Sequence, residues 1–255
     1  LTDNFAPVEN LVAPVVQQRE TRRIADRFKA RGDIAVKENN LKKAVKYFNK
    51  ALKINPDSAQ LHNNLANVLP RQNELEEAIS HYHQALGLNP DFSLAHSNLA
   101  VILAGQGKLD KAFSHYQKAL DIDPDSAETH YNLGLILSAL GKINESIETY
   151  KKALQINPDL AQAHVSLGNI MDQRADYTQA LKHYRAALTA QPDYAQAHNN
   201  IASVLIKQNK IEEAVSHYYK ALELDPNYET ARSNLNRIMN ITRSPKEEGQ
   251  LTEGI

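Results

Sequence analysis

The sequence predicts an all-α protein, a solenoid in which antiparallel helix pairs follow one another along the chain. Three observations predict this fold: a proline that recurs every thirty-four residues, an apolar stripe at helical spacing before each proline, and a second amphipathic pattern before that stripe. A fixed period of this length indicates an array of supersecondary units rather than a single core. The recurring prolines are Pro56, Pro90, Pro124, Pro158, Pro192 and Pro226.

The stripe before each proline predicts the second helix of each unit. In the unit that ends at Pro158, a small residue, an aromatic ring and another small residue stand at Ser146, Tyr150 and Ala153. Spacings of four and three place them on one face of a helix, where the ring fills the space beside the small residues. A ring is present in all six units, as Phe48, Tyr82, Tyr116, Tyr150, Tyr184 and Tyr218.

The first helix of each unit has its own apolar pattern, such as Leu65, Ala66 and Leu69, and ends near Gly, Asn or Asp. Helix A, a tight turn, helix B and a proline turn therefore form one repeat, and this pattern resembles the tetratricopeptide repeat family. The resemblance implies a right-handed superhelix in which helix A lines a concave groove. The family's tryptophan near the start of helix A is absent, and that fourth position holds Phe28, His62, His96, His130, His164 and His198.

The period also predicts the domain organisation. We expect a flexible leader at 1–14, an extension of the first helix at 15–24 because Pro14 is well placed to open a helix, and a disordered tail at 243–255. A capping helix at 229–242 would cover the last apolar face, as a soluble solenoid requires. The six repeats between them are 25–58, 59–92, 93–126, 127–160, 161–194 and 195–228.

The bulk composition excludes several classes of protein. No apolar run approaches the ~20 residues that span a bilayer, and the chain has no cysteine. We therefore expect no membrane insertion and no thiol chemistry, and a soluble protein that is cytoplasmic or the soluble part of a longer or anchored chain. No Gly-rich phosphate loop, nucleophile elbow or paired carboxylates stand out. These residues predict a non-enzymatic protein without a cofactor.

The ten histidines raise the question of a metal site. Besides those of helix A, four precede the aromatic residue of helix B. A zinc site needs three or four converging ligands, whereas equivalent side chains in an array stand a whole repeat apart. We therefore expect no metal site and interpret the histidines as packing or hydrogen-bonding residues. The helix B set is His81, His115, His183 and His217.

Asparagine recurs at the sixth position of helix A, which the resemblance places in the groove, and Ser166 alone interrupts this ladder. Asn is a mediocre helix former, and its amide offers both a donor and an acceptor. Such a ladder can pair with both N–H and C=O of an extended peptide; the alternatives are bonds between neighbouring repeats or duplication of one ancestral repeat. With adjacent groove positions, the predicted peptide-binding residues are Asn64, Asn67, Asn98, Tyr131, Asn132, Asn169, Asn200 and Asn234.

The ladder and segments such as 95–100 also resemble the repeat region of O-linked N-acetylglucosamine transferases. That resemblance implies binding of protein substrates for a separate catalytic domain, of which these residues carry no motif. Our main prediction is a protein–protein interaction scaffold that binds an extended peptide or partner segment in its groove. The alternatives are the substrate-targeting region of a larger enzyme, such as a protein O-glycosyltransferase, and a self-assembling structural protein.

Charge is distributed unevenly: the segment from Arg19 to Lys53 has twelve basic and four acidic residues. We interpret it as a solvated helix surface, with contact to an acidic partner or membrane surface as the alternative. The groove positions are mostly neutral, so we expect no nucleic-acid partner. The carboxylate clamp of chaperone adaptors is not expected either, because Asp33, Leu94 and Asn98 stand where Asn, Lys and Arg are needed.

Overall fold

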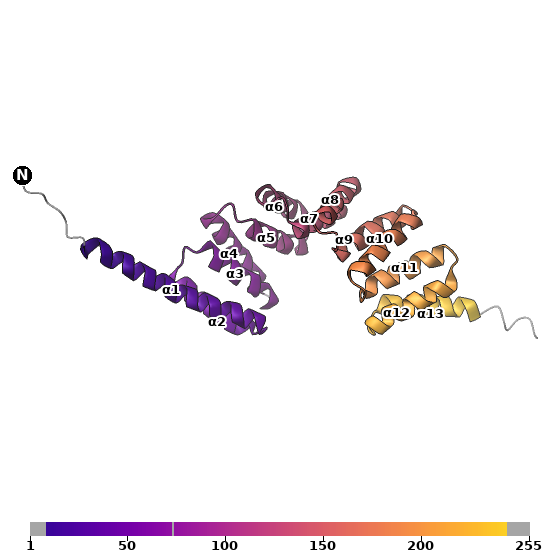
Figure 1. Cartoon of the computed structure of the whole chain (residues 1–255), viewed down its shortest axis with the longest axis horizontal. Coiled ribbons are helices and arrows are strands. Elements are labelled where there is room, and N and C mark those ends of the chain that lie inside the picture. The colour runs from indigo at the N-terminus through magenta and orange to yellow at the C-terminus, as the bar shows by residue number, and fades with distance from the viewer. Residues whose placement is uncertain (1–8, 73, 244–255) are drawn as a thin grey trace, which may run out of the picture. The chain divides into compact units, whose positions relative to one another are not determined.

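The computed structural model describes residues 9–72 and 74–243, which form helices throughout and no strand. The chain divides into two compact units, Leu1–Pro124 and Asp125–Ile255, and each is described by itself. In the first unit, antiparallel pairs α1–α2, α3–α4 and α5–α6 follow one another (Figure 1). The helices are α1 (Glu9–Lys37), α2 (Leu41–Ile54), α3 (Ala59–Val68), the 3-10 helix η1 (Leu69–Gln72), α4 (Leu75–Leu88), α5 (Ser93–Gly105) and α6 (Leu109–Ile122).

The second unit repeats the arrangement with three further pairs, α7–α8, α9–α10 and α11–α12, and the last helix, α13, packs on α12 and α11. This unit is a solenoid of the kind that the period predicts, closed by a helix without a partner of its own. Its helices are α7 (Ala127–Ala139), α8 (Ile143–Ile156), α9 (Ala161–Gln173), α10 (Tyr177–Ala190), α11 (Ala195–Lys207), α12 (Ile211–Leu224) and α13 (Glu229–Arg243).

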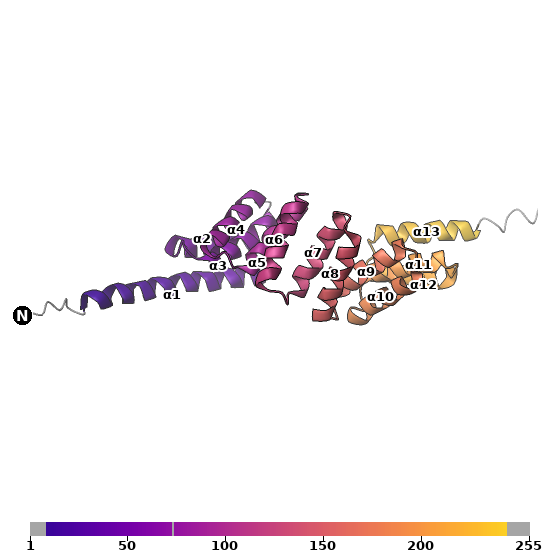
Figure 2. The same cartoon turned by 90° about the horizontal axis from the view of Figure 1, so that it is seen from above.

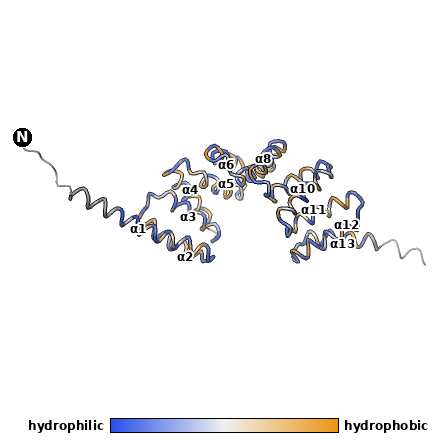
Figure 3. Tube along the Cα trace, in the orientation of Figure 1, coloured by the Kyte–Doolittle hydropathy of each residue, from blue (hydrophilic) through white to orange (hydrophobic). Residues whose placement is uncertain are grey.

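The core of each repeat is the aromatic ring of helix B. The side chain of Tyr184 is 1% exposed, and a methyl group at Gly168 on the facing helix would lie 2.4 Å from its Cε1 atom. A residue with no side chain at Gly168 therefore lets the backbone of α9 approach the ring directly. Hydrophilic and hydrophobic residues alternate along the coloured helices of Figure 3, as expected for helices that bury one face.

The turn between helix A and helix B requires one residue in the left-handed region. Gly107 and Gly141 adopt φ 73° and 76°, but the same turn position holds Asn39, Ala175 and Asn209 in other repeats, at φ 56°, 59° and 60°. Asn tolerates this conformation better than other non-glycine residues, whereas Ala has no compensating side-chain hydrogen bond. Ala175 is therefore a strained position.

Each proline ends helix B by restricting the residue before it. Asn157, which precedes Pro158, adopts φ −128° and ψ 94°, as proline requires of its predecessor. Its N–H still donates to the carbonyl of Ala153 at 2.8 Å, and its side chain accepts from the N–H of Asp159 at 3.1 Å. The proline turn is thus hydrogen-bonded on both sides and starts the next repeat at a fixed point.

Two helix boundaries depart from simple expectation. Helix α1 begins at Glu9, before Pro14, so residues 9–14 are helical and not a flexible leader; Figure 2 shows α1 running well past α2. Helix α3 ends at Val68 and continues as η1 around Pro70, because proline removes an N–H from the helix interior. The rest of the leader, residues 1–8, lies outside the described residues. So does the predicted tail, 243–255, except for Arg243, which is the last residue of α13 and is helical. No described helix is long and apolar enough to cross a membrane.

Tyr150 should be essential for stability, since its side chain is 1% exposed. We predict that Tyr150→Ala lowers the free energy of unfolding by roughly 3–5 kcal/mol, as truncation of a buried aromatic does. The matched control is Tyr219→Ala, because Tyr219 lies on a helix B with 54% of its surface exposed. Urea unfolding should separate the two variants; similar small losses in both would contradict the assigned core.

Ala175 and Gly141 provide a reciprocal pair, since both occupy the left-handed turn position. We predict that Ala175→Gly raises the free energy of unfolding by roughly 0.5–1 kcal/mol, because glycine removes the strain but adds entropy to the unfolded chain. Gly141→Ala should lower it by a similar amount. The check is the urea midpoint of each variant, and a loss of stability in Ala175→Gly would refute the strain.

Candidate functional site: the polar face of the A helices

The predicted peptide-binding residues lie on α3, α5, α7, α9, α11 and α13, the A helices and the closing helix. Asn67 is exposed and the other seven are half-buried, so all can reach solvent in the described structure. The structure brings several of them together in pairs, each formed between one helix A and the next within a unit. It places no ligand there, and binding by these residues stays a prediction.

In the first unit, the sixth position of one helix A bonds to the ninth position of the preceding one. Asn98 on α5 donates from Nδ2 to Oδ1 of Asn67 on α3, at 2.9 Å. The hydroxyl of Tyr82 on α4 donates to the same oxygen. Burial raises the pKa of Tyr82, which keeps this hydroxyl protonated and able to donate. Asn67 is thus held by its own repeat and by the next.

The second unit contains the same arrangement. Asn200 on α11 donates to Oδ1 of Asn169 on α9 at 2.9 Å, and the hydroxyl of Tyr184 donates to that oxygen at 2.8 Å. We call Asn98–Asn67 and Asn200–Asn169 the amide pairs. Their recurrence indicates that the ladder links neighbouring repeats. Such bonds are the alternative to peptide binding that the sequence left open.

The remaining predicted residues form weaker or different contacts. Asn64 donates to Asp33 at 3.3 Å, and Asn234 donates to the buried Asn199 at 3.4 Å. Tyr131 lies against Tyr150, with ring centroids 5.9 Å apart. Asn132 makes no side-chain hydrogen bond among the described residues of its unit.

A hydrogen-bond acceptor at the ninth position of the preceding helix A accounts for three of the ladder bonds. Where it is Asp33, Asn67 or Asn169, the following asparagine finds an acceptor. In the third and fourth repeats it is Val101 and Leu135, which are 50% and 40% exposed and have no hydrogen-bonding group. The ladder is therefore regular in sequence but not in its hydrogen bonds.

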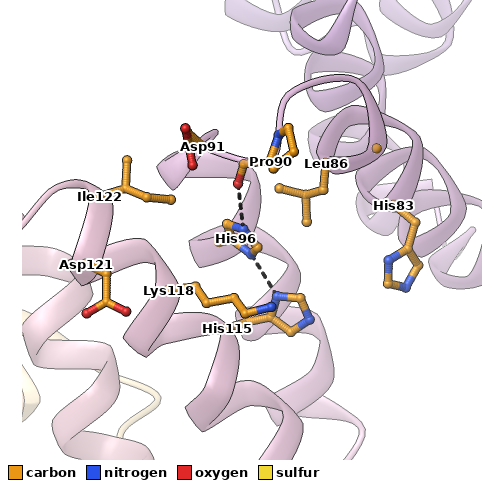
Figure 4. A pocket seen from close by; sticks show the side chains of 10 residues that line it. His83, Leu86, Pro90, Asp91, His96, His115, Lys118, Asp121 and Ile122 are labelled. Carbon is orange, nitrogen blue, oxygen red and sulfur yellow. Dashed lines mark hydrogen bonds between the residues drawn. The ribbon is translucent and has the colours of Figure 1, made fainter.

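A second polar layer joins the two helices of a repeat through pairs of histidines. His96 and His115 lie with their Nδ1 atoms 2.9 Å apart, and Nε2 of His96 lies 3.1 Å from the carbonyl of Pro90 (Figure 4). The Nδ1–Nδ1 distance is 2.9 Å in two further repeats and 3.3 Å in a fourth. We call these the histidine pairs: His62–His81, His96–His115, His164–His183 and His198–His217.

His62 and His96 are buried and the other members of the histidine pairs are half-buried. Burial is the main cause that lowers the pKa values of His81, His96 and His198. The pKa of His115 falls to about 4, with His96 and Lys118 adding to the effect of burial. Burial also lowers the pKa values of His164, His183 and His217. At neutral pH these rings carry no charge.

Two pockets in the first unit open onto the histidine pairs. One, of about 580 Å³, is lined by His96 and His115 together with Lys118 and two carboxylates, Asp91 and Asp121 (Figure 4). The other, of about 840 Å³, has the equivalent lining one repeat earlier, around His62 and His81. In neither does a third ligand complete a metal site: among the described residues, no group of three His, Cys, Asp or Glu side chains can hold a metal ion.

Comparison with known families agrees with the repeat geometry. Models of the tetratricopeptide repeat match residues 91–159, 125–193 and 195–228, and a model of the TPR repeat matches 32–73 and 67–107. The chain belongs to the tetratricopeptide repeat family. The finer resemblance to the repeats of the transferases stays a prediction. Comparison with curated proteins gives no match.

Solved structures share the fold at low sequence identity. Pseudomonas aeruginosa pilF aligns with a TM-score of 0.75 and 20% identity over 87% of this chain and 99% of its own. The APC/C hetero-tetramer Cut9–Hcn1 aligns with 0.74 and 21% over 90% of this chain and 45% of that one. YrrB, described as a TPR protein with an unusual peptide-binding site, aligns with 0.57 and 24% over 74% and 97%. These likenesses establish the fold alone.

The sequence indicated packing or hydrogen bonding for the histidines, and bonds between neighbouring repeats as one alternative for the asparagines, but it did not identify the partners. The two histidines of every pair are nineteen residues apart, a spacing that recurs four times. The amide pairs have a spacing of thirty-one residues. Both spacings could have been found by searching for polar residues that recur at a fixed separation on two different helices. The predictions from sequence compared only equivalent positions of successive repeats.

The amide pairs predict a measurable contribution to stability. Asn200→Ala removes the bond to Asn169 and the bond that Asn200 accepts from Asn199. It should cost about 0.5–1.5 kcal/mol per bond more than Asn132→Ala, which removes no side-chain hydrogen bond among the described residues. Both substitutions gain the same helix propensity, so the difference isolates the side-chain hydrogen bonds of Asn200. Urea unfolding of the two variants provides the measurement. Equal midpoints would show that the amide pair does not stabilise the array.

Proposed function

We propose that this protein is an interaction scaffold that binds an extended segment of a partner protein along the polar face of its A helices. The observation that carries the proposal is the geometry of the amide pairs, which recurs in both units. Each pair fixes two amides before any ligand arrives. A binding group that is already ordered loses little conformational entropy when it binds.

The amide pairs retain hydrogen-bonding capacity after their internal bonds are made. Asn67 and Asn169 use Oδ1 to accept from a tyrosine and from the next asparagine, so both hydrogens of their Nδ2 remain for a ligand. Asn98 and Asn200 donate one N–H and keep an acceptor lone pair on Oδ1. Adjacent donors and acceptors match the alternating C=O and N–H groups of an extended backbone.

The surroundings of the amide pairs favour backbone recognition over recognition of one charged motif. In the second unit the nearby charges are already paired, since Lys207 bonds both carboxylate oxygens of Asp172 at 2.7 Å. In the first unit the exposed neighbours on α5 are Leu94 and Val101, which are apolar. A partner segment of neutral, partly apolar sequence fits this face best.

The test uses linear peptides selected from a random library on the wild-type protein. Asn98→Ala, Asn132→Ala and Asn200→Ala combined should weaken binding of those peptides about tenfold or more, at ~0.5–1.5 kcal/mol for each lost bond. Fluorescence polarisation at a temperature well below the unfolding of both proteins gives the affinity. Circular dichroism confirms that the variant is folded.

A matched control places three substitutions on the B helices instead. Gln117→Ala, Lys151→Ala and Arg185→Ala change exposed residues next to the core tyrosines and should leave affinity unchanged. If the B-helix variant loses affinity and the asparagine variant keeps it, the recognition surface lies on the opposite helices. If the library yields no peptide, binding of extended segments is refuted as the function of this face.

A further inference from the structure

We propose that the four histidine pairs make this array sensitive to acid: while neutral they hold the proline turn, helix A and helix B of a repeat together, and they release these elements on protonation. The proposal concerns a surface distinct from the amide pairs and does not depend on peptide binding. It rests on a hydrogen-bond chain that recurs in four of the six repeats.

The second repeat fixes the direction of this chain. Nδ1 of His81 lies 2.9 Å from Oε1 of Gln84, a pure acceptor, so Nδ1 of His81 carries the hydrogen. That N–H also points to Nδ1 of His62, at 2.9 Å, which must therefore accept. Neutral His62 then carries its hydrogen on Nε2 and donates it to the carbonyl of Pro56 at 2.9 Å. Every partner stays satisfied as long as the ring of His62 is neutral, because only its Nδ1 accepts within the chain.

The same assignment fits the other pairs. His96 and His164 place Nε2 at 3.1 Å from the carbonyls of Pro90 and Pro158, and His198 bonds the carbonyl of Pro192. In this assignment, Nε2 of each helix B histidine carries a lone pair that none of these hydrogen bonds uses. In the third repeat the pocket of Figure 4 gives solvent access to this ring.

A proton that enters a pair has two successive effects. The first binds Nε2 of the helix B histidine and creates an imidazolium in a half-buried site, which desolvation opposes. A second would have to bind Nδ1 of the helix A histidine, the acceptor in the pair. It would break the bond between the rings and place two positive charges about 3 Å apart. The repeat can avoid both costs by separating the helices.

Neighbouring charges set how strongly each pair responds. His115 faces His83 on α4 and Lys118 on its own helix, which oppose protonation, while Asp91 in the proline turn favours protonation of His96. His183 faces Lys182 and Lys151, which also oppose it. We therefore expect the third and fifth repeats to be the most acid-sensitive.

The other two pairs have a carboxylate near the helix B ring. Glu77 lies 3.9 Å from Nε2 of His81, and Glu213 favours protonation of His217, although Arg185 opposes it. The cation Lys220 also opposes protonation of His198. These pairs should accept the first proton more readily than the pair of the third repeat.

The sign of the pH dependence follows from linkage. Unfolded histidine titrates near 6.5, and burial lowers the folded pKa values of the four helix B histidines, that of His115 to about 4. Between these values the unfolded chain binds more protons than the folded one. The stabilisation is therefore fully present above the unfolded value and is lost as the pH falls towards the folded one.

The sequence itself suggests which residue can replace the helix B histidines in a test. The fourth repeat holds Thr149 at the position where the four repeats with histidine pairs have the helix B histidine. The variant His81→Thr, His115→Thr, His183→Thr and His217→Thr copies that solution into all four pairs. Urea unfolding of wild type and variant at about pH 7.5 and about pH 5 gives the two pH dependences, and subtraction removes the common effect of the carboxylates.

We expect the unfolding equilibrium constant of the wild type to rise about 100-fold more on acidification than that of the variant. His115 alone, with its pKa lowered to about 4, would contribute about 30-fold at pH 5 without solvent screening, and the expected factor allows for that screening of half-buried groups. Equal pH dependence in the two proteins would overturn the proposal. So would a smaller dependence in the wild type, which would mean that the pairs share a proton favourably.

A second measurement on the wild type does not require any variant to fold. The Cε1–H resonances of the histidines, followed by NMR against pH, give the midpoint of each ring in the folded protein. His115 should titrate well below 6.5 and below His81, because only His81 has a carboxylate close to Nε2. Midpoints at or above 6.5 for the paired histidines would overturn the proposal.

Discussion

The burial of one aromatic ring per repeat against small residues is the interaction on which the rest of this structure depends. Tyr150, Tyr184 and Tyr218 are each 1% exposed, and Ala or Gly on the facing helix allows the close approach. This contact fixes the distance between helix A and helix B. The amide pairs and the histidine pairs both connect residues across these helices, so their short distances exist only because the aromatic contact places the backbones first.

The amide pairs and the histidine pairs lie around this apolar centre and connect different elements. The amide pairs join successive A helices through Asn98 and Asn200, and each uses the hydroxyl of the core tyrosine as a third partner. The histidine pairs join the two helices of one repeat to the preceding proline turn. A core ring with a polar tip, which Tyr provides and Phe does not, is thus hydrogen-bonded to the amide pairs on the A helices. In the first repeat, where that ring is Phe48, the ninth position is Asp33 instead of an amide.

The sequence was sufficient to predict the helices and turns of the repeat, because the same local pattern recurs at a strict period. Each repeat has its own equivalents of the stripe around Tyr150, the proline after helix B and the turn residue Gly141. These three signals predict the same helix boundaries, so a weak signal in one repeat does not change the prediction. The start of α1 at Glu9 could not be found in this way, since that segment has no counterpart in the period. Proline is tolerated early in a helix, and Pro14 did not mark its first residue.

The site was less predictable because one sequence position does not determine a hydrogen bond. Asn98 and Asn132 occupy equivalent positions, yet only Asn98 has an acceptor at the ninth position of the preceding repeat in its unit. The position of the asparagines on the A helices followed from the period. Asn64, Asn98 and Asn200 are bonded to the residue thirty-one positions earlier, whereas Asn234 is bonded to Asn199, thirty-five positions earlier.

The central claim is that the amides of the A helices contact the partner's backbone, and side-chain NMR tests it most directly. The Nδ2 resonances of Asn67, Asn98, Asn169 and Asn200 would be followed during titration with a peptide selected on the protein. The account predicts that these resonances shift and that their hydrogens become protected from solvent exchange, because they donate to peptide carbonyls. Shifts confined to residues of the B helices, with the four amides unchanged at saturation, would contradict it.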